Sequence, residues 1–381
     1  MVRVDFENRE RLAEIMDKEF YKCYQCGTCT VNCLLGYSLL VRRTIRHVQL
    51  GLTPSNGYIW KCISCNYCGA ECPSNVDIAR IFRSLKVLKY EEKSYPEKVN
   101  EVLWNVYEEG NPLGSPRKER FIWLQKTGSS HEYDVLIYTC CMAAYDKHGQ
   151  DVLMRTAYIL EKAGLKVGFF TDSSCCGDAV YHMGDDYFYE EIANQNSEKL
   201  DSYKAEAILT VSPHVYHNLR NLYPKYNARI STPVLHHTQY LYELMNSGRL
   251  KLGKIEAKVT YHDPCYLARY NNIVEEPRGL IEAIDGVKLI EMPHNKRETL
   301  CCGGGGGGIW LENEEARDVT RRRLDEVVYV DVTTMATSCP YCIRMFEDES
   351  KVMNLNVNVM DITELLYEAL VNMVRASSSG L

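Results

Sequence analysis

Cysteine is the feature that most restricts what this chain can fold into. The sequence has 381 residues and seventeen cysteines, and every cysteine falls in a group: eight in residues 23–72, four in residues 140–176 and five in residues 265–342. A chain of this length can bury a sizeable core and is not a short secreted scaffold, so a disulfide framework is not expected. The grouping favours metal ligation over scattered buried thiols.

The first eight cysteines form two motifs of the spacing C-x2-C-x2-C-x3-C, at 23–33 and 62–72, and Pro73 follows the second. This is the spacing of two-cluster bacterial ferredoxins, in which the fourth cysteine of each motif binds the other cluster. Two zinc knuckles are the alternative, but zinc sites usually pair two C-x2-C units. We predict two cubane [4Fe–4S] sites, one held by Cys23, Cys26, Cys29 and Cys72 and the other by Cys62, Cys65, Cys68 and Cys33.

Two details qualify this pattern. Leu34 stands where the first motif usually has proline, which removes no ligand. The fourth cysteine of each motif is expected to start a helix that leads to the neighbouring cluster.

The cysteine groups divide the chain into domains. Residues 1–112 read as a helical ferredoxin-like domain, with helical apolar spacing over 8–20, 38–50 and 76–92. Residues 113–130, rich in Gly, Pro and Ser, are predicted to be a linker.

Residues 131–248 and 255–372 read as two copies of one unit. Each copy has a strand that runs into cysteine (134–141 and 258–265), a second strand (166–170 and 287–292) and a Cys-Cys-Gly turn. A third strand enters a Pro-containing turn (207–219 and 332–346), and an extended segment and a helix close the copy (233–245 and 357–370). Equivalent positions lie 125, 126 and 127 residues apart at Cys140, Cys175 and Pro213. This indicates a tandem duplication of an α/β unit with a mainly parallel sheet.

Charge and hydropathy exclude several classes of protein. The formal net charge of -7 gives no electrostatic support to nucleic-acid binding. No apolar run reaches the roughly 18–20 residues that span a bilayer, and the charged N-terminus lacks the core of a signal peptide. We expect a cytoplasmic protein, or one peripheral on a membrane complex, and we interpret residues 376–381 as a tag remnant.

The second copy carries an unusual set of thiols. Its five cysteines are Cys265, the adjacent pair Cys301 and Cys302, and Cys339 and Cys342 in a C-x2-C motif. Adjacent cysteines do not easily cap one cubane, so the pair suggests an unusual cluster. Six glycines follow the pair, and their first three, Gly303, Gly304 and Gly305, are expected to let the backbone pack against the cofactor and direct N–H groups at sulfur.

With these motifs in place, the chain resembles the CCG (cysteine-rich) domain iron–sulfur oxidoreductases, most specifically the D-type subunit of heterodisulfide reductase. It is also similar to the iron–sulfur subunits of glycolate, D-lactate and anaerobic glycerol-3-phosphate dehydrogenases and to thiol:fumarate reductase. The resemblance covers about residues 15–370. It implies that Cys265, Cys301, Cys302, Cys339 and Cys342 bind a noncubane [4Fe–4S] cluster and are the catalytic residues.

The first copy departs from this pattern. Cys140, Cys141, Cys175 and Cys176 are present, but Ser212-Pro213-His214-Val215 stands where the second C-x2-C is expected. The sequence leaves open a metal-free structural unit or a zinc ion or further cluster on these thiols. Four histidines lie near this place and are candidate substitute ligands, although an ordinary hydrogen-bonded histidine is the favoured interpretation of each: His214, His217, His236 and His237.

The residues His262-Asp263 before Cys265 leave a similar choice between two roles. One is a proton donor for thiolate leaving groups, and the other is a strand-end hydrogen bond.

The resemblance predicts the function. We expect an oxidoreductase subunit of anaerobic metabolism that passes electrons through the two cubane clusters to the noncubane cluster, which reduces or forms a small or protein-borne disulfide. The alternative is an electron-relay subunit of an FAD-linked 2-hydroxy-acid or glycerol-3-phosphate dehydrogenase. No flavin or nicotinamide fingerprint is present. The expected partner is therefore a flavoprotein, a ferredoxin, or a membrane quinone or cytochrome subunit.

Overall fold

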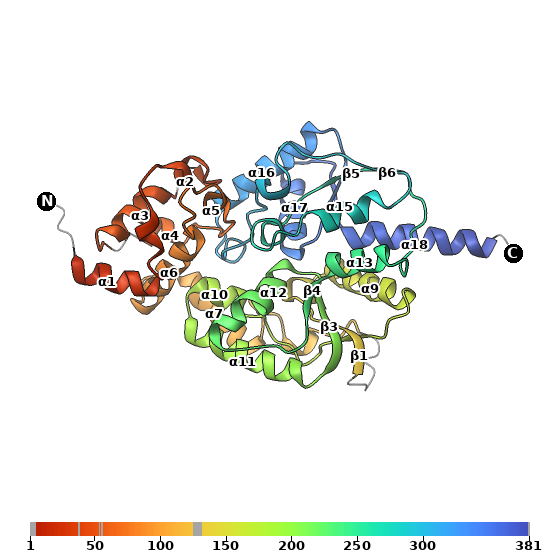
Figure 1. The fold of residues 1–381 in the computed structure, drawn as a ribbon, viewed down its shortest axis with the longest axis horizontal. Helices are drawn as coiled ribbons and strands as arrows, with labels where there is room; N and C mark the ends of the chain where they lie inside the picture. The colour runs from red at the N-terminus through yellow and green to blue at the C-terminus, as the bar shows by residue number, and fades with distance from the viewer. Residues whose placement is uncertain (1–4, 37–38, 53, 55, 125–131, 380–381) are drawn as a thin grey trace.

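The computed structural model describes residues 5–36, 39–52, 54, 56–124 and 132–379. Within this part the chain forms a helical N-terminal domain at one end and two α/β units beside it (Figure 1). Residues 125–130 of the predicted linker and the last two residues of the predicted tag lie outside the described residues. No helix of the described part has the length and apolar character needed to cross a bilayer.

The N-terminal domain packs around amphipathic helices. In α3, Val41, Ile45 and Val48 recur at helical spacing and are fully or almost fully buried. Asp77 caps α6, where its Oδ1 accepts the N–H of Arg80 at 3.0 Å. The elements of the domain are α1 (Phe6–Ile15), a 3-10 turn (Glu19–Lys22), α2 (Thr28–Val31), α3 (Val41–Gln49), α4 (Asn56–Ile59), α5 (Tyr67–Ala70) and α6 (Ile78–Glu91). The next helix, α7 (Glu97–Glu109), packs on α10 (Asp178–Met183) of the first α/β unit.

One detail of the sequence prediction is wrong. Cys33 and Cys72 do not start helices. Each follows a one-turn helix, α2 or α5, that carries the third cysteine of its motif. The compact C-x2-C spacing leaves room for only one turn before the fourth cysteine, so the next long helix begins later.

The two α/β units share one topology. Each has a four-stranded sheet, with orders β2-β1-β3-β4 and β6-β5-β7-β8, and every recorded strand pair is parallel. The predicted fold class is therefore confirmed. The strands are β1 (Glu132–Ile137), β2 (Val167–Phe169), β3 (Lys204–Thr210), β4 (Val234–His236), β5 (Ala257–Tyr261), β6 (Val287–Leu289), β7 (Thr334–Thr337) and β8 (Asn358–Asp361).

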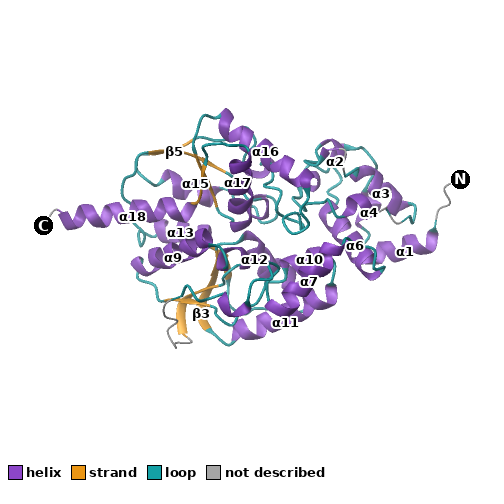
Figure 2. Cartoon of the chain, turned by 180° about the vertical axis from the view of Figure 1, so that it is seen from behind, coloured by secondary structure: helices purple, strands orange, loops and turns teal. Residues whose placement is uncertain are grey.

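Helices cover the sheets, as a parallel sheet requires (Figure 2). In the central strand β1, Val135, Leu136 and Ile137 are completely buried. The helices of the first unit are α8 (Cys141–Ala144), α9 (Lys147–Lys162), α10 (Asp178–Met183), α11 (Asp186–Asp201), α12 (Pro213–His217) and α13 (His237–Asn246). Those of the second unit are α14 (Cys265–Ala268), α15 (Glu275–Glu282), α16 (Glu314–Tyr329), α17 (Pro340–Val352) and α18 (Ile362–Ser379).

Equivalent helices join the two units reciprocally. The last helix of the first unit, α13, packs on α15, and the last helix of the second unit, α18, packs on α9 (Figure 1). The described part of the predicted linker lies against the first unit, where the guanidinium of buried Arg120 donates to the Thr139 carbonyl at 2.7 Å.

This topology decides where the cysteines lie. In each unit the chain order reverses between the two central strands, and open parallel sheets place ligands in the crevice beyond the carboxyl ends of such strands. Cys140 follows β1, whereas Cys265 follows β5 and Cys339 follows β7. Parallel strands thus bring thiols that are distant in sequence to one edge of the sheet.

Candidate metal centres

Four cysteines of the N-terminal domain surround one small cavity near the surface. Cys23, Cys26, Cys29 and Cys72 line it, together with Arg42. Cys26 is exposed, and its contact with the Thr28 hydroxyl at 3.3 Å lowers the pKa of the thiol. The structure thus brings the last cysteine of the second motif to the first three cysteines of the first motif.

The other four cysteines surround a second, more enclosed cavity, lined by Cys33, Cys62, Cys65 and Cys68. Burial raises the pKa of the Cys33 thiol to about 12. Thiolates are the metal-binding form, and metal binding to thiols of high pKa releases their protons. The donor set around each cavity is four sulfurs, which fits a cubane cluster.

Three long side chains hold the loop that carries Cys62 and Cys65. Lys86 Nζ donates to the Cys62 carbonyl at 3.3 Å, Tyr270 Oη donates to the Ser64 carbonyl at 2.8 Å, and Arg269 Nε donates to the Cys65 carbonyl at 2.7 Å. Burial lowers the pKa of Lys86 to about 8. Lys86 belongs to the N-terminal domain, and Arg269 and Tyr270 belong to the second α/β unit. Residues from both parts of the molecule therefore position this loop.

The five cysteines of the second unit lie together at the edge of its sheet. The Sγ atoms of Cys265 and Cys301 are 4.0 Å apart, and Cys302 and Cys339 both contact Cys342. All five are buried. The Cys301 thiol also contacts Cys65, so this group adjoins the second N-terminal cavity.

The glycine run fills the space between the two groups. The N–H of Gly303 donates to Cys301 Sγ at 3.4 Å. A Cβ on Gly306 would lie 2.6 Å from the Cys62 carbonyl oxygen, and one on Gly305 would lie 2.9 Å from the Ile63 carbonyl oxygen. Only residues without side chains allow the two backbones to approach this closely.

The four cysteines of the first unit are also close to one another. Cys141 contacts Cys175, and Arg120 Nη1 donates to Cys141 Sγ at 3.3 Å. Cys140 contacts Ser212, which occupies the place of a missing ligand, and burial raises the pKa of Cys140 to about 12. Across the described residues, no three His, Cys, Asp or Glu side chains converge closely enough to hold a single metal ion.

His214, one of the candidate substitute ligands, faces the second unit. Its Nδ1 lies 3.1 Å from Asp178 Oδ2, and its ring stacks between Tyr266 and Tyr341 with centroids 4.1 and 4.2 Å away. The imidazole also contacts the Cys339 thiol. Burial alone would raise the pKa of Cys339, but contacts with Cys342 and His214 lower it to about 7.

The other three candidate histidines have partners of their own. His217 Nδ1 lies 3.0 Å from Asn221 Nδ2, His236 Nδ1 lies 2.8 Å from Thr238 Oγ1, and His237 Nε2 lies 3.2 Å from Asp361 Oδ1. The contacts of His217 and His236 are those of ordinary hydrogen-bonded histidines. His237 meets Asp361 at ion-pair distance, and within the described residues neither of its ring nitrogens forms a hydrogen bond.

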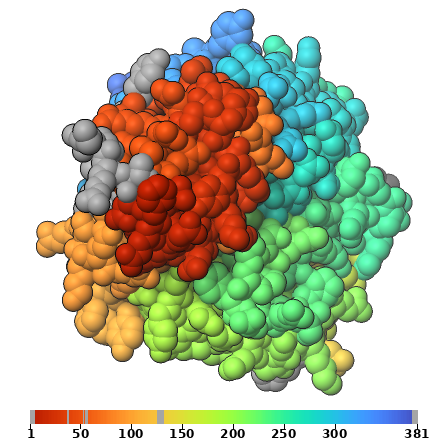
Figure 3. Space-filling view, turned by 60° about the vertical axis from the view of Figure 1, so that its left-hand side comes forward, coloured from red at the N-terminus to blue at the C-terminus, as the bar shows by residue number. Residues whose placement is uncertain are grey.

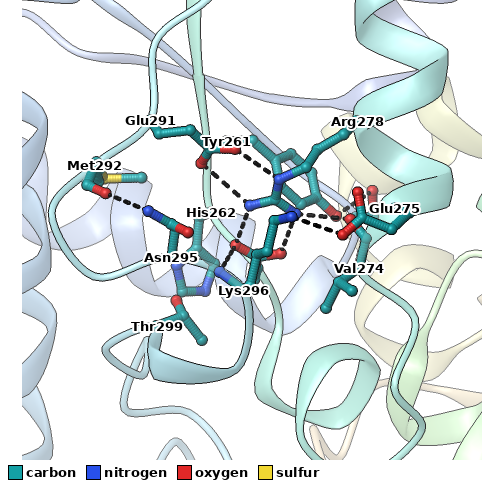
Figure 4. Close-up of polar contacts among 12 residues, drawn as sticks. Tyr261, His262, Val274, Glu275, Arg278, Glu291, Met292, Asn295, Lys296 and Thr299 are labelled. Carbon is teal, nitrogen blue, oxygen red and sulfur yellow. Dashed lines mark hydrogen bonds and ion pairs between the residues drawn. The ribbon is translucent and has the colours of Figure 1, made fainter.

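Asp263, before Cys265, belongs to a structural ion pair with Arg278. Figure 4 shows Arg278 with its other partner, Glu291. Both of its oxygens accept from Arg278, at 2.7 and 2.9 Å, and Glu291 engages the same guanidinium. The N–H of Lys296 adds a third donor at 2.8 Å. These contacts favour the strand-end role for Asp263.

His262 is also held inside the second unit. Its Nδ1 accepts from Arg323 Nε at 3.1 Å, and burial lowers the pKa of His262 well below its ordinary value. A neutral imidazole that accepts from arginine is poorly suited to donate a proton from that nitrogen. The contacts favour a packing role here too.

Three residues of these sites escaped the sequence analysis: Lys86, Arg269 and Asp178. Lys86 and Arg269 lie in helical or turn segments with no motif, and nothing local distinguishes a buried cation from an exposed one. Asp178 directly follows the Cys-Cys-Gly turn of the first unit. Its place directly after that turn is the one feature of the sequence that could have indicated a role near the thiols.

Comparison with known proteins identifies the domains that carry the thiols of the two α/β units. The Cysteine-rich domain family, CCG, matches residues 135–220 and 259–347. The chain is 29% identical over 330 residues to the probable iron-sulfur-binding oxidoreductase FadF of Bacillus subtilis, and 30% identical over 334 residues to the EtfAB:quinone oxidoreductase of Syntrophomonas wolfei. Each alignment covers 82% of this chain and 46% of the relative, so the chain spans about half the length of these two proteins.

A third relative is matched over more of its length. The D-type subunit of the dihydromethanophenazine:CoB–CoM heterodisulfide reductase of Methanosarcina barkeri is 26% identical over 324 residues, which are 81% of this chain and 77% of that relative. Among solved structures, a hypothetical protein from Helicobacter pylori has a TM-score of 0.55 at 10% identity, covering 96% of this chain and 73% of that one. That likeness shows a shared fold.

Proposed function

The chain belongs to the iron–sulfur proteins built on tandem CCG cysteine-rich domains, and we propose that it is an electron-transfer subunit that ends in a disulfide-active site. The observation that carries this proposal is the contact between Cys65 and Cys301. It joins the enclosed cavity to the five-cysteine group, and Ile78 lines both the enclosed cavity and the surface cavity, so the three groups of thiols follow one another. Bound iron–sulfur clusters supply one-electron redox chemistry at each position.

Each group of thiols is assigned one cofactor. The first cubane [4Fe–4S] cluster is held by Cys23, Cys26, Cys29 and Cys72, and the second by Cys62, Cys65, Cys68 and Cys33. A noncubane [4Fe–4S] cluster is held by Cys265, Cys301, Cys302, Cys339 and Cys342. The first unit, which keeps four thiols and lacks the C-x2-C pair, is assigned none.

The protein around the five-cysteine group supplies orientation and access. The Gly303 N–H is directed at Cys301, and hydrogen-bond donors of this kind orient ligands and adjust their electronic properties. A cleft of about 680 Å³ is lined by both α/β units and by α7. It reaches Pro340 and Ile343, which lie two residues before and one residue after Cys342, and Trp310 lies on its wall. A disulfide substrate would approach through this cleft.

The proposal is tested with protein purified without oxygen. Wild type is expected to hold about 12 iron atoms per chain, and Cys339→Ser/Cys342→Ser about 8. A paramagnetic signal that appears only on oxidation in the presence of thiols should vanish in this variant. The matched control is Cys141→Ser/Cys175→Ser in the first unit, which should keep both the iron and the signal.

Two results would overturn this assignment. One is an iron content of about 8 in the wild type, which would leave the second unit without a cluster. The other is loss of the thiol-dependent signal from the control and not from the Cys339 variant, which would move the site to the first unit.

The similarity to an EtfAB:quinone oxidoreductase favours a second candidate function. Here the chain relays electrons between a flavoprotein and a quinone or cytochrome subunit, or serves an FAD-linked dehydrogenase, and no thiol substrate is involved. In that case a panel of thiols leaves the spectra unchanged. Reduction of all clusters by the flavoprotein would then be the only activity.

A further inference from the structure

The surface cavity of Cys23, Cys26, Cys29 and Cys72 is the outer end of the proposed electron path. The N-terminal domain that holds it forms one end of the molecule (Figures 1 and 3). Around the cavity Cys26 is exposed, Tyr24 is 63% exposed and Val31 is 78% exposed. The enclosed cavity and the five-cysteine group lie inward, so electrons exchanged with another protein would pass through this face.

The helix beside this cavity is strongly basic. α3 turns Val41, Ile45 and Val48 to the core and exposes Arg42, Arg43 and Arg46. Arg42 lines the cavity itself, with its Cδ 3.6 Å from the place of a Cβ on Gly27. Within the described part of the chain, none of the three arginines forms an ion pair.

The charge of α3, which has three arginines and no acidic residue, is opposite to that of the chain as a whole. The formal net charge is -7, yet among the described residues Arg42, Arg43 and Arg46 have no carboxylate at ion-pair distance. Lys22, beside Cys23, differs because its Nζ lies 2.7 Å from Glu19 Oε1. Unpaired surface charge adds little to folding but attracts an oppositely charged partner and speeds its encounter.

We propose that Arg42, Arg43 and Arg46 on α3 dock an acidic electron-carrier protein over the Cys23 cavity. This inference rests on the proposed function. In each encounter the reduced carrier loses one electron and the site gains one, and no bond forms or breaks. A lipid surface could also bind arginines, but it would bring no electron to the cavity.

The test uses the cluster-loaded chain and, as the probe, a photoreduced acidic two-cluster ferredoxin in stopped flow. Arg43→Glu/Arg46→Glu should lower the second-order rate of electron transfer about tenfold at low ionic strength and flatten its salt dependence. Arg42 is left in place because it lines the cavity. The matched control carries the same change of charge on the α/β units, at exposed Lys251→Glu/Lys288→Glu, and should react like wild type.

Three outcomes would overturn the docking proposal. One is an unchanged rate and salt slope in the arginine variant, and another is an equal loss in the lysine control, which would show an effect of net charge alone. The third is loss of binding to phosphatidylglycerol vesicles by the arginine variant while its electron-transfer rate stays at the wild-type value. Reduction by dithionite distinguishes a failure of the docking proposal from a failure of the proposed function. If dithionite reduces no cluster in the wild type, the result contradicts the proposed function.

Discussion

The imidazole of His214 lies face to face on the phenol of Tyr341, with ring centroids 4.2 Å apart and planes 17° from parallel. The two residues occupy the same position in the two repeats, after Pro213 and Pro340. The first repeat, which has lost its C-x2-C pair, therefore contributes a side chain to the surroundings of the second repeat's thiols. The fold that the first repeat retains therefore helps to position groups around the thiols of the second repeat.

His214→Phe is expected to destabilise the protein. Phenylalanine can keep the stack between Tyr266 and Tyr341, but the buried Asp178 then loses the nearer of its two histidine contacts. It keeps Asn218, whose Nδ2 donates to Oδ1 at 3.1 Å, and His182 at 3.8 Å, whose pKa burial lowers to about 3, so that His182 stays neutral. Removing one member of a buried pair costs about 3–5 kcal/mol. Urea unfolding should show a loss near the lower end of that range.

The double variant His214→Phe/Asp178→Asn serves as the control for this effect. An amide carries no charge, so it should recover part of the lost stability. The pairing would be contradicted if the double variant lost as much free energy of unfolding as His214→Phe and Asp178→Asn lose together.

A second pair of contacts joins the two α/β units and should make their stability depend on pH. His148 on α9 lies 2.8 Å from Glu347 and 2.6 Å from Glu364, both in the second unit, and these hydrogen bonds raise the pKa of His148 to about 10 from its ordinary 6.5. Since the folded pKa is raised, the stabilisation is complete below pH 6.5 and is lost as the pH rises through 10.

His148→Gln isolates this contribution. We expect it to lower the free energy of unfolding by about 2 kcal/mol at pH 6, the value of a hydrogen bond between charged groups, and by much less above pH 10. The free energy of unfolding is measured for wild type and variant from pH 6 to above pH 10. The difference between the two proteins cancels the contributions of the other titrating groups. A constant difference would show that His148 acts through packing alone.

Gly306→Ala tests the close approach of the glycine run to the cluster loop. Gly306 has φ +60°, and its Cβ would lie 2.5 Å from the Ile63 carbonyl carbon. Gly248→Ala is the matched control, because φ there is +75° and nothing lies within 4 Å of the Cβ. The control should lose about 1 kcal/mol from backbone strain, and Gly306→Ala clearly more.

The same pair of variants has a second readout. If the glycine run sets the distance between Cys65 and Cys301, electron transfer from the N-terminal clusters to the second unit should slow in Gly306→Ala only. Equal effects of both substitutions on stability and rate would show that the run has no special packing role.

Much of the fold could be predicted from the sequence because its signals are local. Cysteine motifs, the Cys-Cys-Gly turns and the prolines mark where each strand ends, and the repeated order Cys140 to Pro213 and Cys265 to Pro340 marks the duplication. The predicted parallel sheets are confirmed, and the two extended segments predicted at 233–245 and 357–370 contain the fourth strands, β4 and β8.

Contacts between domains could not be predicted in the same way. Nothing near Lys86 distinguishes it from the exposed lysines of other helices, and Tyr270 reaches Ser64 across 206 residues of sequence. The partners of His214 lie on three separate elements. Such contacts depend on how folded units pack, and a single sequence carries no local pattern for that packing.

The buried charge of Lys86 leads to a prediction about redox potential. Lys86 is 1% exposed, and its Nζ donates to the Cys62 carbonyl and to the Gly306 carbonyl at 2.6 Å. A cation beside a cluster favours its reduced, more negative state. Lys86→Met should therefore lower the midpoint potential of the site formed by Cys33, Cys62, Cys65 and Cys68, on the order of 60 mV for about 1.4 kcal/mol in a one-electron couple.

An EPR-monitored redox titration of the cluster-loaded protein would measure this change. Lys89→Met is the matched control, because Lys89 lies on the same helix but pairs with Glu92 at 2.7 Å. The control should leave all potentials unchanged. The potential of the Cys23 site should stay unchanged in both variants because, among the described contacts of Lys86, the one with a cysteine-bearing loop of the N-terminal domain is to Cys62 in the second loop. An equal shift at both sites would point to a general loss of structure, since a local charge acts most strongly on the nearest cluster.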